Sequence, residues 1–380
     1  MDTKIHFNRS APAGREWEYM RQAVAAGHLS GDGEFTRRCH EWLKEHLGVH
    51  SVLLTTSCTH ALEMAALLLE LDPGDEVIVP DFTFVSTVNA FVLHGARPVF
   101  CDIRPDTLNL DERILQSLIT ERTRAIVPVH YAGVGCEMDA ILTLAASRGI
   151  SVIEDNAHGL FGRYRGRMLG SLGRLAAQSF HETKNVTCGE GGALLINDPA
   201  LVERAEIIRE KGTNRSRFFR GQVDKYSWVD IGSSYLPSEL LAAYLLAQLE
   251  ASSKLQAARR RIWGRYAAEL GDWAAARGVR LPVIPPHCEH PYHMFYLLMP
   301  GLDVRQAFIA HMRAMGILAV FHYLPLHRSV MGASFVSQGY DCPVSRNVSD
   351  RLVRLPFYAG LTEADQGEVI AAAKGFTGWL

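Results

Sequence analysis

The sequence predicts an α/β fold with a large, mainly parallel sheet, followed by a smaller α+β domain. Short apolar segments alternate with longer amphipathic ones through the first two-thirds of the chain, which is typical of parallel strands joined by helices. The apolar segments are rich in β-branched residues and end on polar residues, as suits strands buried on both faces. The length of 380 residues exceeds what one core usually accommodates, so two domains are expected.

The order of these segments defines the predicted elements. Six segments are predicted strands: 76–80 (EVIVP), 98–102 (PVFCD), 125–130 (AIVPVH), 151–155 (SVIED), 176–180 (AAQSF) and 193–197 (ALLIN). Four segments have the apolar spacing of helices: 60–71, 111–120, 138–149 and 201–212. The first of these helices precedes the first predicted strand, the next two lie between predicted strands, and the fourth follows the last one.

A long helical pattern covers residues 238–270, directly after Pro237. Its first half is apolar and its second half is rich in arginine, with the change near Lys254. We therefore expect a large domain with an N-terminal arm over residues 1–254 and a small C-terminal α+β domain over residues 255–380.

The composition and charge of the chain argue against several classes of protein. The formal net charge is −2, which leaves no overall basic character for binding nucleic acid. No apolar run reaches the roughly 18 to 20 residues that cross a bilayer, and the N-terminus lacks the apolar core of a signal peptide. The seven cysteines are odd in number and form no CxxC pair, so neither a disulfide framework nor a metal site is expected. These features predict a cytoplasmic protein that binds neither nucleic acid nor membrane.

Two predicted strands end at or shortly before charged residues that could bind a cofactor or act in catalysis. Asp155 closes the strand 151–155, and Lys184 follows the strand 176–180, 29 positions further along the chain. Ligands of open α/β sheets bind beyond the carboxyl ends of the strands, so both side chains are expected at one site. Alone, Asp155 is more often a helix cap, and a single loop lysine is usually solvated. The pair is the informative feature.

Pyridoxal phosphate (PLP) gives this pair a chemical reason. The cofactor withdraws electrons well only while its ring nitrogen is protonated, and a carboxylate such as Asp155 would keep it so. An amine must also form the imine with the aldehyde and later move a proton, and a desolvated lysine does both. Lys184 is therefore the predicted Schiff-base and catalytic residue.

The segment 57–59 predicts a binding site for the cofactor phosphate. Ser57, Cys58 and Thr59 lead into the helix expected from His60, and free amides at a helix start bind anions. The alternative interpretation is an ordinary N-cap. Ser179, five residues before Lys184, offers another hydroxyl to the cofactor.

Several motifs resemble the DegT/StrS-type sugar aminotransferases, in order and spacing through nearly the whole chain. They are SCT (57–59), TFVST (83–87), ED (154–155), SFHETKN (179–185) and GEGG (189–192). The resemblance implies the type I, aspartate-aminotransferase fold and a homodimer with active sites at the subunit interface. It implies that Phe84 stacks on the cofactor ring and that His158 lies near the ring or its hydroxyl.

The resemblance also implies the reaction. An amino group would move from glutamate to the 4-keto carbon of dTDP-4-keto-6-deoxyglucose, giving dTDP-4-amino-4,6-dideoxygalactose. A 3-keto sugar, a UDP-linked sugar and the gluco epimer remain alternatives within the family. A carbon–sulfur lyase would need a cysteine on a mobile loop, for which Cys188 is a poor candidate. A regulator that keeps the cofactor without catalysis is the alternative outside enzymes.

The chain departs from the family where many relatives carry a Gly-aromatic-Asn-Tyr-Arg motif. Here the segment 232–236 reads GSSYL, so Ser234 replaces the asparagine that reaches the partner's phosphate, and Leu236 replaces the arginine. The donor carboxylate therefore has no assigned partner. The candidates for substrate binding are the basic aromatic segment 211–225 and two histidines, namely Arg215, Arg217, Phe218, Arg220, His322 and His327.

Overall fold

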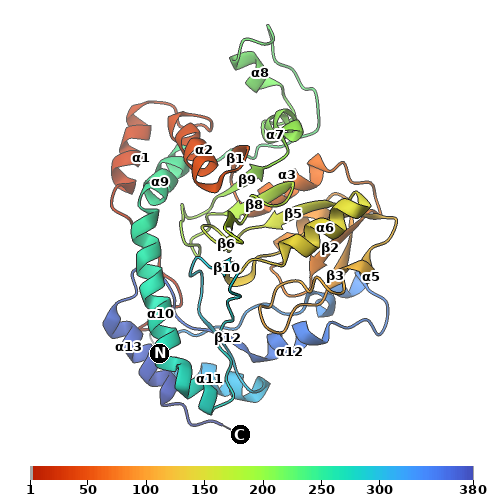
Figure 1. Cartoon of the computed structure of the whole chain (residues 1–380). Helices are drawn as coiled ribbons and strands as arrows, with labels where there is room; N and C mark the ends of the chain where they lie inside the picture. Colours follow the sequence, from red (N-terminus) through yellow and green to blue (C-terminus); the bar gives the residue numbers. More distant parts are fainter. Residues whose placement is uncertain (1–2, 380) are drawn as a thin grey trace.

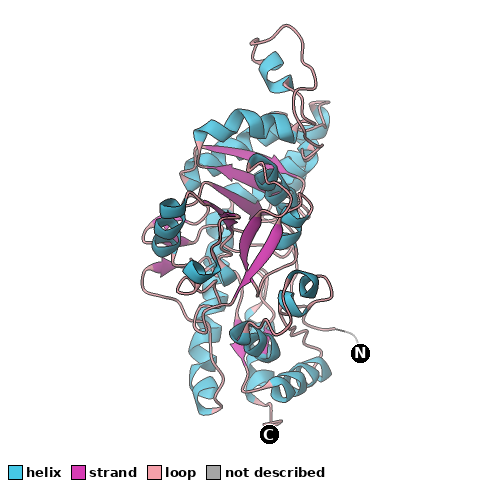
Figure 2. Ribbon diagram, turned by 90° about the vertical axis from the view of Figure 1, so that its right-hand side faces the viewer, coloured by secondary structure: helices cyan, strands magenta, loops and turns pink. Residues whose placement is uncertain are grey.

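The protein forms a seven-stranded sheet covered by helices on both faces, with a second packed unit below it (Figures 1 and 2). The computed structural model describes residues 3–379. The strand order is β1-β9-β8-β5-β4-β2-β3, and only β9 runs antiparallel to its neighbours. The strand bounds are β1 Ser51–Thr55, β2 Glu76–Pro80, β3 Arg97–Cys101, β4 Thr123–Ile126, β5 Ser151–Asp155, β8 Leu175–Ser179 and β9 Gly192–Ile196.

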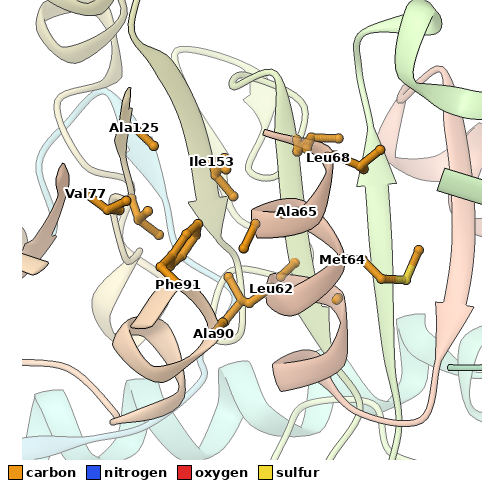
Figure 3. Packing of buried hydrophobic residues seen from close by; sticks show 14 of the residues in the cluster. Leu62, Met64, Ala65, Leu68, Val77, Ala90, Phe91, Ala125 and Ile153 are labelled. Carbon is orange, nitrogen blue, oxygen red and sulfur yellow. The ribbon is translucent and has the colours of Figure 1, made fainter. Parts of the chain in front are cut away.

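Helices bury apolar side chains against both faces of the sheet. One face packs against α3 (Cys58–Leu68), α4 (Ser86–Val92) and α7 (Val202–Arg209). In Figure 3, Leu62 and Ala65 of α3 lie over Ile153 of β5, and Phe91 of α4 lies beside Val77 of β2. The other face packs against α2 (Glu34–Leu47), α6 (Met138–Arg148) and α9 (Glu239–Glu250). A sheet covered on both faces explains why its strands read as continuous apolar runs.

The smaller elements of the first unit connect these layers. α1 (Glu16–Ala25) packs on α9, and α5 (Leu115–Leu118) is a single turn. Two-residue strands β6 (Arg163–Tyr164) and β7 (Arg167–Met168) form a small sheet with β10 (Cys288–Glu289). α8 (Arg215–Phe219) lies on a loop that stands out from the body, at the top of Figure 1.

The second unit has its own hydrophobic core. It contains α10 (Ser252–Ala276), α11 (Leu302–Ala314), α12 (Pro343–Arg351), α13 (Glu363–Lys374) and the strand pair β11 (Tyr296–Leu298) and β12 (Leu352–Arg354). Leu255 still packs with the first unit, whereas Ile262 and Tyr266 belong to the second core. Ile5 also packs in the second core, so the N-terminal segment reaches the small unit.

Four element predictions need correction. The strand 125–130 ends at Ile126, because Pro128 has no N–H to donate to a ladder. The helix 111–120 shrinks to α5, since the Asp111 carboxylate accepts the Arg113 N–H at 3.1 Å and favours a turn. The helix 238–270 is two helices with a break at Ala251. Strand β1 was not among the predicted strands.

A buried carboxylate anchors the entry to α2. Glu239, at the start of α9, accepts the backbone N–H groups of Gly33, Phe35 and Thr36 at 3.1, 2.8 and 3.0 Å. These are N–H groups that the first turn of a helix leaves unpaired. One acidic side chain therefore caps α2 and joins it to α9. Within residues 3–379, no helix is both long and apolar enough to span a membrane.

Candidate active site

A cavity of about 800 Å³ lies where the carboxyl ends of β5 and β8 meet the second unit. The start of α3, the start of α4 and the loop after β8 form one side. The second unit contributes residues 293–294, 320–323 and 354, and the N-terminal residues Phe7 and Asn8 close another side. The sequence predicted a site at the carboxyl ends of the strands, and the cavity lies at that edge of the sheet.

Lys184 reaches this cavity from the loop after β8. Its backbone N–H donates to the His181 carbonyl at 2.9 Å, which fixes a tight turn at the end of the strand. Burial lowers the pKa of the Lys184 amine to about 8, partly opposed by the negative potentials of Cys58 and Asp155. A larger fraction of this amine is thus neutral near pH 8 than of an exposed lysine.

Asp155 lines the same cavity from the end of β5 and is nearly fully buried. Its Oδ2 accepts the Thr87 hydroxyl at 2.7 Å, and its Oδ1 accepts the Ala157 N–H at 3.1 Å. Burial raises the pKa of Asp155, although these hydrogen bonds and the charge of Lys184 oppose the rise. A buried carboxylate of this kind is stabilised by a cationic partner in the cavity.

The start of α3 forms the anion-binding corner. Ser57 is the N-cap, and its hydroxyl accepts the His60 N–H at 3.1 Å. The Thr59 hydroxyl donates to Ser86 at 2.8 Å. Gly192 of β9 approaches so closely that a Cβ there would lie 2.4 Å from the Cys58 nitrogen. Only glycine permits this approach, and it holds the amides of the helix start at the cavity wall.

A cluster of aromatic and imidazole rings lines the side next to the second unit. His158 stacks on His293 with ring centroids 4.3 Å apart, and His322 stacks on Tyr323 at 3.5 Å. Tyr131 bonds His322 Nδ1 at 2.7 Å. Burial, followed by nearby positive charge, lowers the pKa of all three histidines well below the usual value, so they are neutral at pH 7.

Pyridoxal phosphate fits these residues on three grounds. A desolvated amine and a buried carboxylate face one cavity, as the aldehyde and the ring nitrogen require. The helix start at Ser57 presents amides for a phosphate. The Nδ1 atom of His158 is buried without a hydrogen-bond partner among the described residues, so the cavity holds a polar atom that a bound ring substituent would satisfy.

The structure brings most predicted site residues together. One cavity is lined by Ser57, Cys58, Thr59, Phe84, Asp155, His158, Ser179, Lys184 and His322. Sequence reasoning did not assign roles to Thr87, Tyr131, His293, Tyr323 or Arg354. Thr87 had a signal, because it lies in the TFVST motif. His293, Tyr323 and Arg354 had none, since they reach the cavity only through the packing of the second unit, and Tyr131 lies in no motif that the sequence singled out.

Six predicted residues lie outside this cavity within one chain. The His327 ring is held by Asp81, with Nδ1 and Oδ2 2.8 Å apart, so it serves a buried contact instead of facing the substrate. Arg215, Arg217 and Arg220 on the α8 loop pair with Glu210, Glu203 and Glu206 of the α7 region. Phe218 lies in the same loop, and Ser234 is exposed near its end.

The chain is similar to known aminotransferases over nearly its whole length. Residues 12–374 match the DegT/DnrJ/EryC1/StrS aminotransferase family. A GDP-perosamine synthase from Caulobacter vibrioides is 35% identical over 94% of each chain. The aminotransferase TlmJ from Streptoalloteichus hindustanus superimposes with a TM-score of 0.89, at 29% identity over 97% of this chain and 98% of that one. The PLP form of the putative sugar aminotransferase Spr1654 from Streptococcus pneumoniae gives 0.88, at 25% identity over 97% of each chain.

These similarities confirm the predicted type I aminotransferase fold, the family and the cofactor class. The family match extends across both packed units, and the cavity between those units holds the lysine, the carboxylate and the anion-binding helix start that the chemistry requires. The chain belongs to the DegT/DnrJ/EryC1/StrS family and is a pyridoxal-phosphate-dependent sugar aminotransferase.

Proposed function

We propose that this enzyme transfers the amino group of glutamate to the 4-keto carbon of dTDP-4-keto-6-deoxy-D-glucose, giving dTDP-4-amino-4,6-dideoxy-D-galactose. The observation that carries the reaction type is the placement of Lys184 and Asp155 in one cavity. The choice of substrate rests on residues 207–240, which resemble the dTDP-4-oxo-6-deoxyglucose aminotransferase of enterobacterial common antigen synthesis. A cytoplasmic location accords with substrates of this kind.

Each residue of the cavity has a proposed role toward the cofactor. Bound there, pyridoxal phosphate supplies the aldehyde that takes up the amino group and the ring that withdraws electrons from the reacting carbon. Asp155 holds the proton on the ring nitrogen, and the amides at Cys58 and Thr59 hold the phosphate. His158 and Ser179 contact the ring substituents, and Phe84 covers one ring face.

Lys184 is the proposed proton carrier. Its Nζ would take the proton from the α-carbon of glutamate and carry it to the bound cofactor. In the second half-reaction the same amine would deliver a proton to the sugar carbon. The lowered pKa of about 8 leaves a substantial fraction of Nζ neutral at physiological pH, so that it can accept this proton.

The α8 loop supports a homodimer with shared active sites. The loop stands away from the body, and Phe219 and Trp228 on it are 70% and 81% exposed (Figures 1 and 2). Large exposed apolar side chains mark surfaces that contact another protein. We propose that this loop lies over the cavity of a second copy, so that Ser234 reaches the cofactor phosphate there. Arg215, Arg217, Phe218 and Arg220 would then contact the nucleotide.

One experiment tests the reaction and the substrate together. The holoenzyme is incubated with glutamate and dTDP-4-keto-6-deoxyglucose, and the amino-sugar is identified by NMR, which also distinguishes the galacto from the gluco product. Parallel reactions use UDP-linked and 3-keto sugars. A GDP-linked 4-keto-6-deoxy sugar is included because of the GDP-perosamine synthase at 35% identity. Amination of the GDP sugar alone would overturn the dTDP assignment and keep the reaction type.

A spectroscopic control separates an enzyme from a cofactor-retaining regulator. Glutamate should bleach the visible absorbance of the bound cofactor, and the keto-sugar should restore it. A holoprotein whose spectrum no amino acid changes would be a regulator, contrary to the proposal.

A further inference from the structure

Arg354 occupies a prominent place on the cavity wall. It ends strand β12 and is the last residue of the strand pair with β11, opposite Tyr296. Its backbone also exchanges two hydrogen bonds with Val320, at 2.7 and 3.1 Å. Because its backbone is held from both sides, the side chain leaves the strand at a fixed point and lines the same cavity as Lys184.

The guanidinium of Arg354 has little to bind within the chain. One terminal nitrogen donates to the Phe321 carbonyl at 3.1 Å, and the guanidinium lies 4.6 Å from the centroid of the Phe7 ring. The Nε atom is buried and has no acceptor among residues 3–379. None of the ion pairs of the described chain includes Arg354, whereas arginines elsewhere, such as Arg209, Arg215 and Arg220, pair with a carboxylate.

A half-buried guanidinium without an ion pair, whose Nε is buried and unsatisfied, is unfavourable unless a ligand supplies its counter-charge. Arginine stays charged in proteins, so it does not escape the cost of burial by losing a proton. Its planar fork of N–H donors matches a carboxylate with two parallel hydrogen bonds. An arginine that lines a ligand cavity and has an unsatisfied Nε therefore indicates a bound anion.

The reaction involves two kinds of anion, phosphates and the donor carboxylate, and the position of Arg354 indicates which of them it binds. The amides at the start of α3, which are proposed to bind the cofactor phosphate, belong to the first unit and line the same cavity. Arg354 instead belongs to the second unit, near His322, Tyr323 and Tyr131, and its charge acts on Lys184 as well. The α-carbon of the donor must lie beside Lys184 for proton transfer. Because the charge of Arg354 also acts on Lys184, its guanidinium is expected to reach the carboxylate attached to that carbon.

We propose that Arg354 binds the α-carboxylate of the amino donor and so fixes its α-carbon beside Lys184. This inference rests on the proposed aminotransferase function. Many relatives carry an arginine where this chain has Leu236. Arg354 would supply a guanidinium for the same purpose from another part of the chain. The Phe7 ring and the Phe321 carbonyl hold the guanidinium in place before the donor arrives.

The test measures the two half-reactions separately in the holoenzyme. The variants are Arg354→Met and Arg354→Lys, with Arg351→Met as the matched control. Arg351 lies three residues earlier, and its guanidinium donates to the Met299 carbonyl and to Asn347, away from the cavity. The expected result is a fall of about 10- to 100-fold in kcat/KM for glutamate with Arg354→Met, as for loss of a hydrogen bond to a charged group. Arg354→Lys should fall less, and the control should match the wild type.

The keto-sugar half-reaction starts from enzyme already carrying the amino group and should keep its rate in both Arg354 variants. Binding of glutarate, a carboxylate that cannot react, should weaken by a similar factor in calorimetry. An equal loss in the keto-sugar half-reaction, or a loss of cofactor affinity, would instead place the arginine on the nucleotide or the phosphate and overturn the proposal.

A third result concerns the proposed function and not Arg354. If wild-type enzyme does not react with glutamate, the donor assignment fails, and alanine and glutamine take its place. Because every α-amino acid carries the same carboxylate, the Arg354→Met loss should appear with whichever donor reacts. Its absence with that donor would contradict the role of Arg354 alone.

Discussion

At the scale of single residues, the site depends on the contrast between two buried groups. Burial disfavours the charge on both Lys184 and Asp155, because each is removed from water. For the lysine this produces a reactive neutral amine. For the aspartate it produces a carboxylate that needs a cation, which the protonated ring nitrogen of the bound cofactor would provide.

Replacement of Lys184 by alanine should leave the fold intact and remove turnover. Lys184 makes its hydrogen bond through its backbone, which alanine retains. Steady-state transamination should fall by at least about 10²- to 10⁴-fold, the usual contribution of a positioned acid-base group. In the wild-type apoenzyme, the rate of cofactor uptake should rise as the pH increases through about 8, where the amine becomes neutral. A rise only near the pKa of an exposed lysine would contradict this environment.

Asp155→Asn should separate stability from function. The raised pKa means that the fold disfavours the ionised carboxylate, so the stability linked to this group is lost as the pH rises through its folded pKa. Asparagine removes that cost and still bonds Thr87 and the Ala157 N–H. The cofactor-free variant should therefore melt no lower than wild type at pH 7. The glutamate half-reaction should nevertheless slow by about 10- to 100-fold, because the ring nitrogen loses its counter-charge. An unchanged single-turnover rate would exclude the role.

At the scale of elements, neighbouring residues of one strand serve different purposes. Side chains alternate along β5, so Glu154 points away from the face that Asp155 uses. Glu154 is fully buried and accepts the N–H groups of Gly170, Leu172 and Gly173 at 2.7 to 2.8 Å, together with His130 at 2.8 Å. It thereby fixes the turn that leads into β8 and, through β8, the position of Lys184.

Glu154→Gln should destabilise the protein and change its response to acid. Burial alone would raise the pKa of Glu154, but the hydrogen bonds from His130 and the backbone outweigh it and lower the pKa. The stability from this carboxylate is present above its unfolded pKa of about 4.3 and is lost as the pH falls through the lower folded value. We expect a loss of about 2 to 4 kcal/mol in the free energy of unfolding at pH 7, measured by urea denaturation.

The difference between Glu154→Gln and wild type should shrink below pH 4, as the wild-type carboxylate takes up a proton. Glu121→Gln, at an exposed position, is the matched control and should unfold like wild type at both pH values. If the stability difference between the variant and wild type does not change with pH, the shape of the Glu154 side chain, and not its charge, stabilises the fold.

Elements were predictable from the sequence where local pattern decides them. The strands 76–80 and 151–155 have the predicted bounds, because each apolar run ends where the chain turns polar. Asp155 and Lys184 were predictable for the same reason, since both follow strand ends. Arg354 and His293 were not, because they reach the cavity through the packing of a distant unit. No local pattern marks a residue for a contact made 170 residues away along the chain.

At the scale of the whole molecule, the cavity lies between two units, and the α8 loop extends away from both. The loop arginines pair with glutamates of α7, which holds the loop in an extended position. Phe219 and Trp228 on this loop are largely exposed, and neither belongs to the hydrophobic cores formed by residues 3–379. A second copy of the chain would bury them and would bring the loop to a cavity that it does not reach within one chain.

If each active site contains residues of both subunits, mixed dimers of two weakly active variants should regain activity. Lys184→Ala keeps an intact loop, and the double variant Arg215→Ala, Arg217→Ala keeps an intact lysine. Each alone should be weakly active. If the loop of one subunit completes the cavity of the other, subunit exchange between the two variants creates dimers in which one site has both parts. Activity should therefore rise on mixing, in proportion to the fraction of hybrid dimers measured by native mass spectrometry. Dimers that exchange without regaining activity would show that each subunit binds its substrate alone.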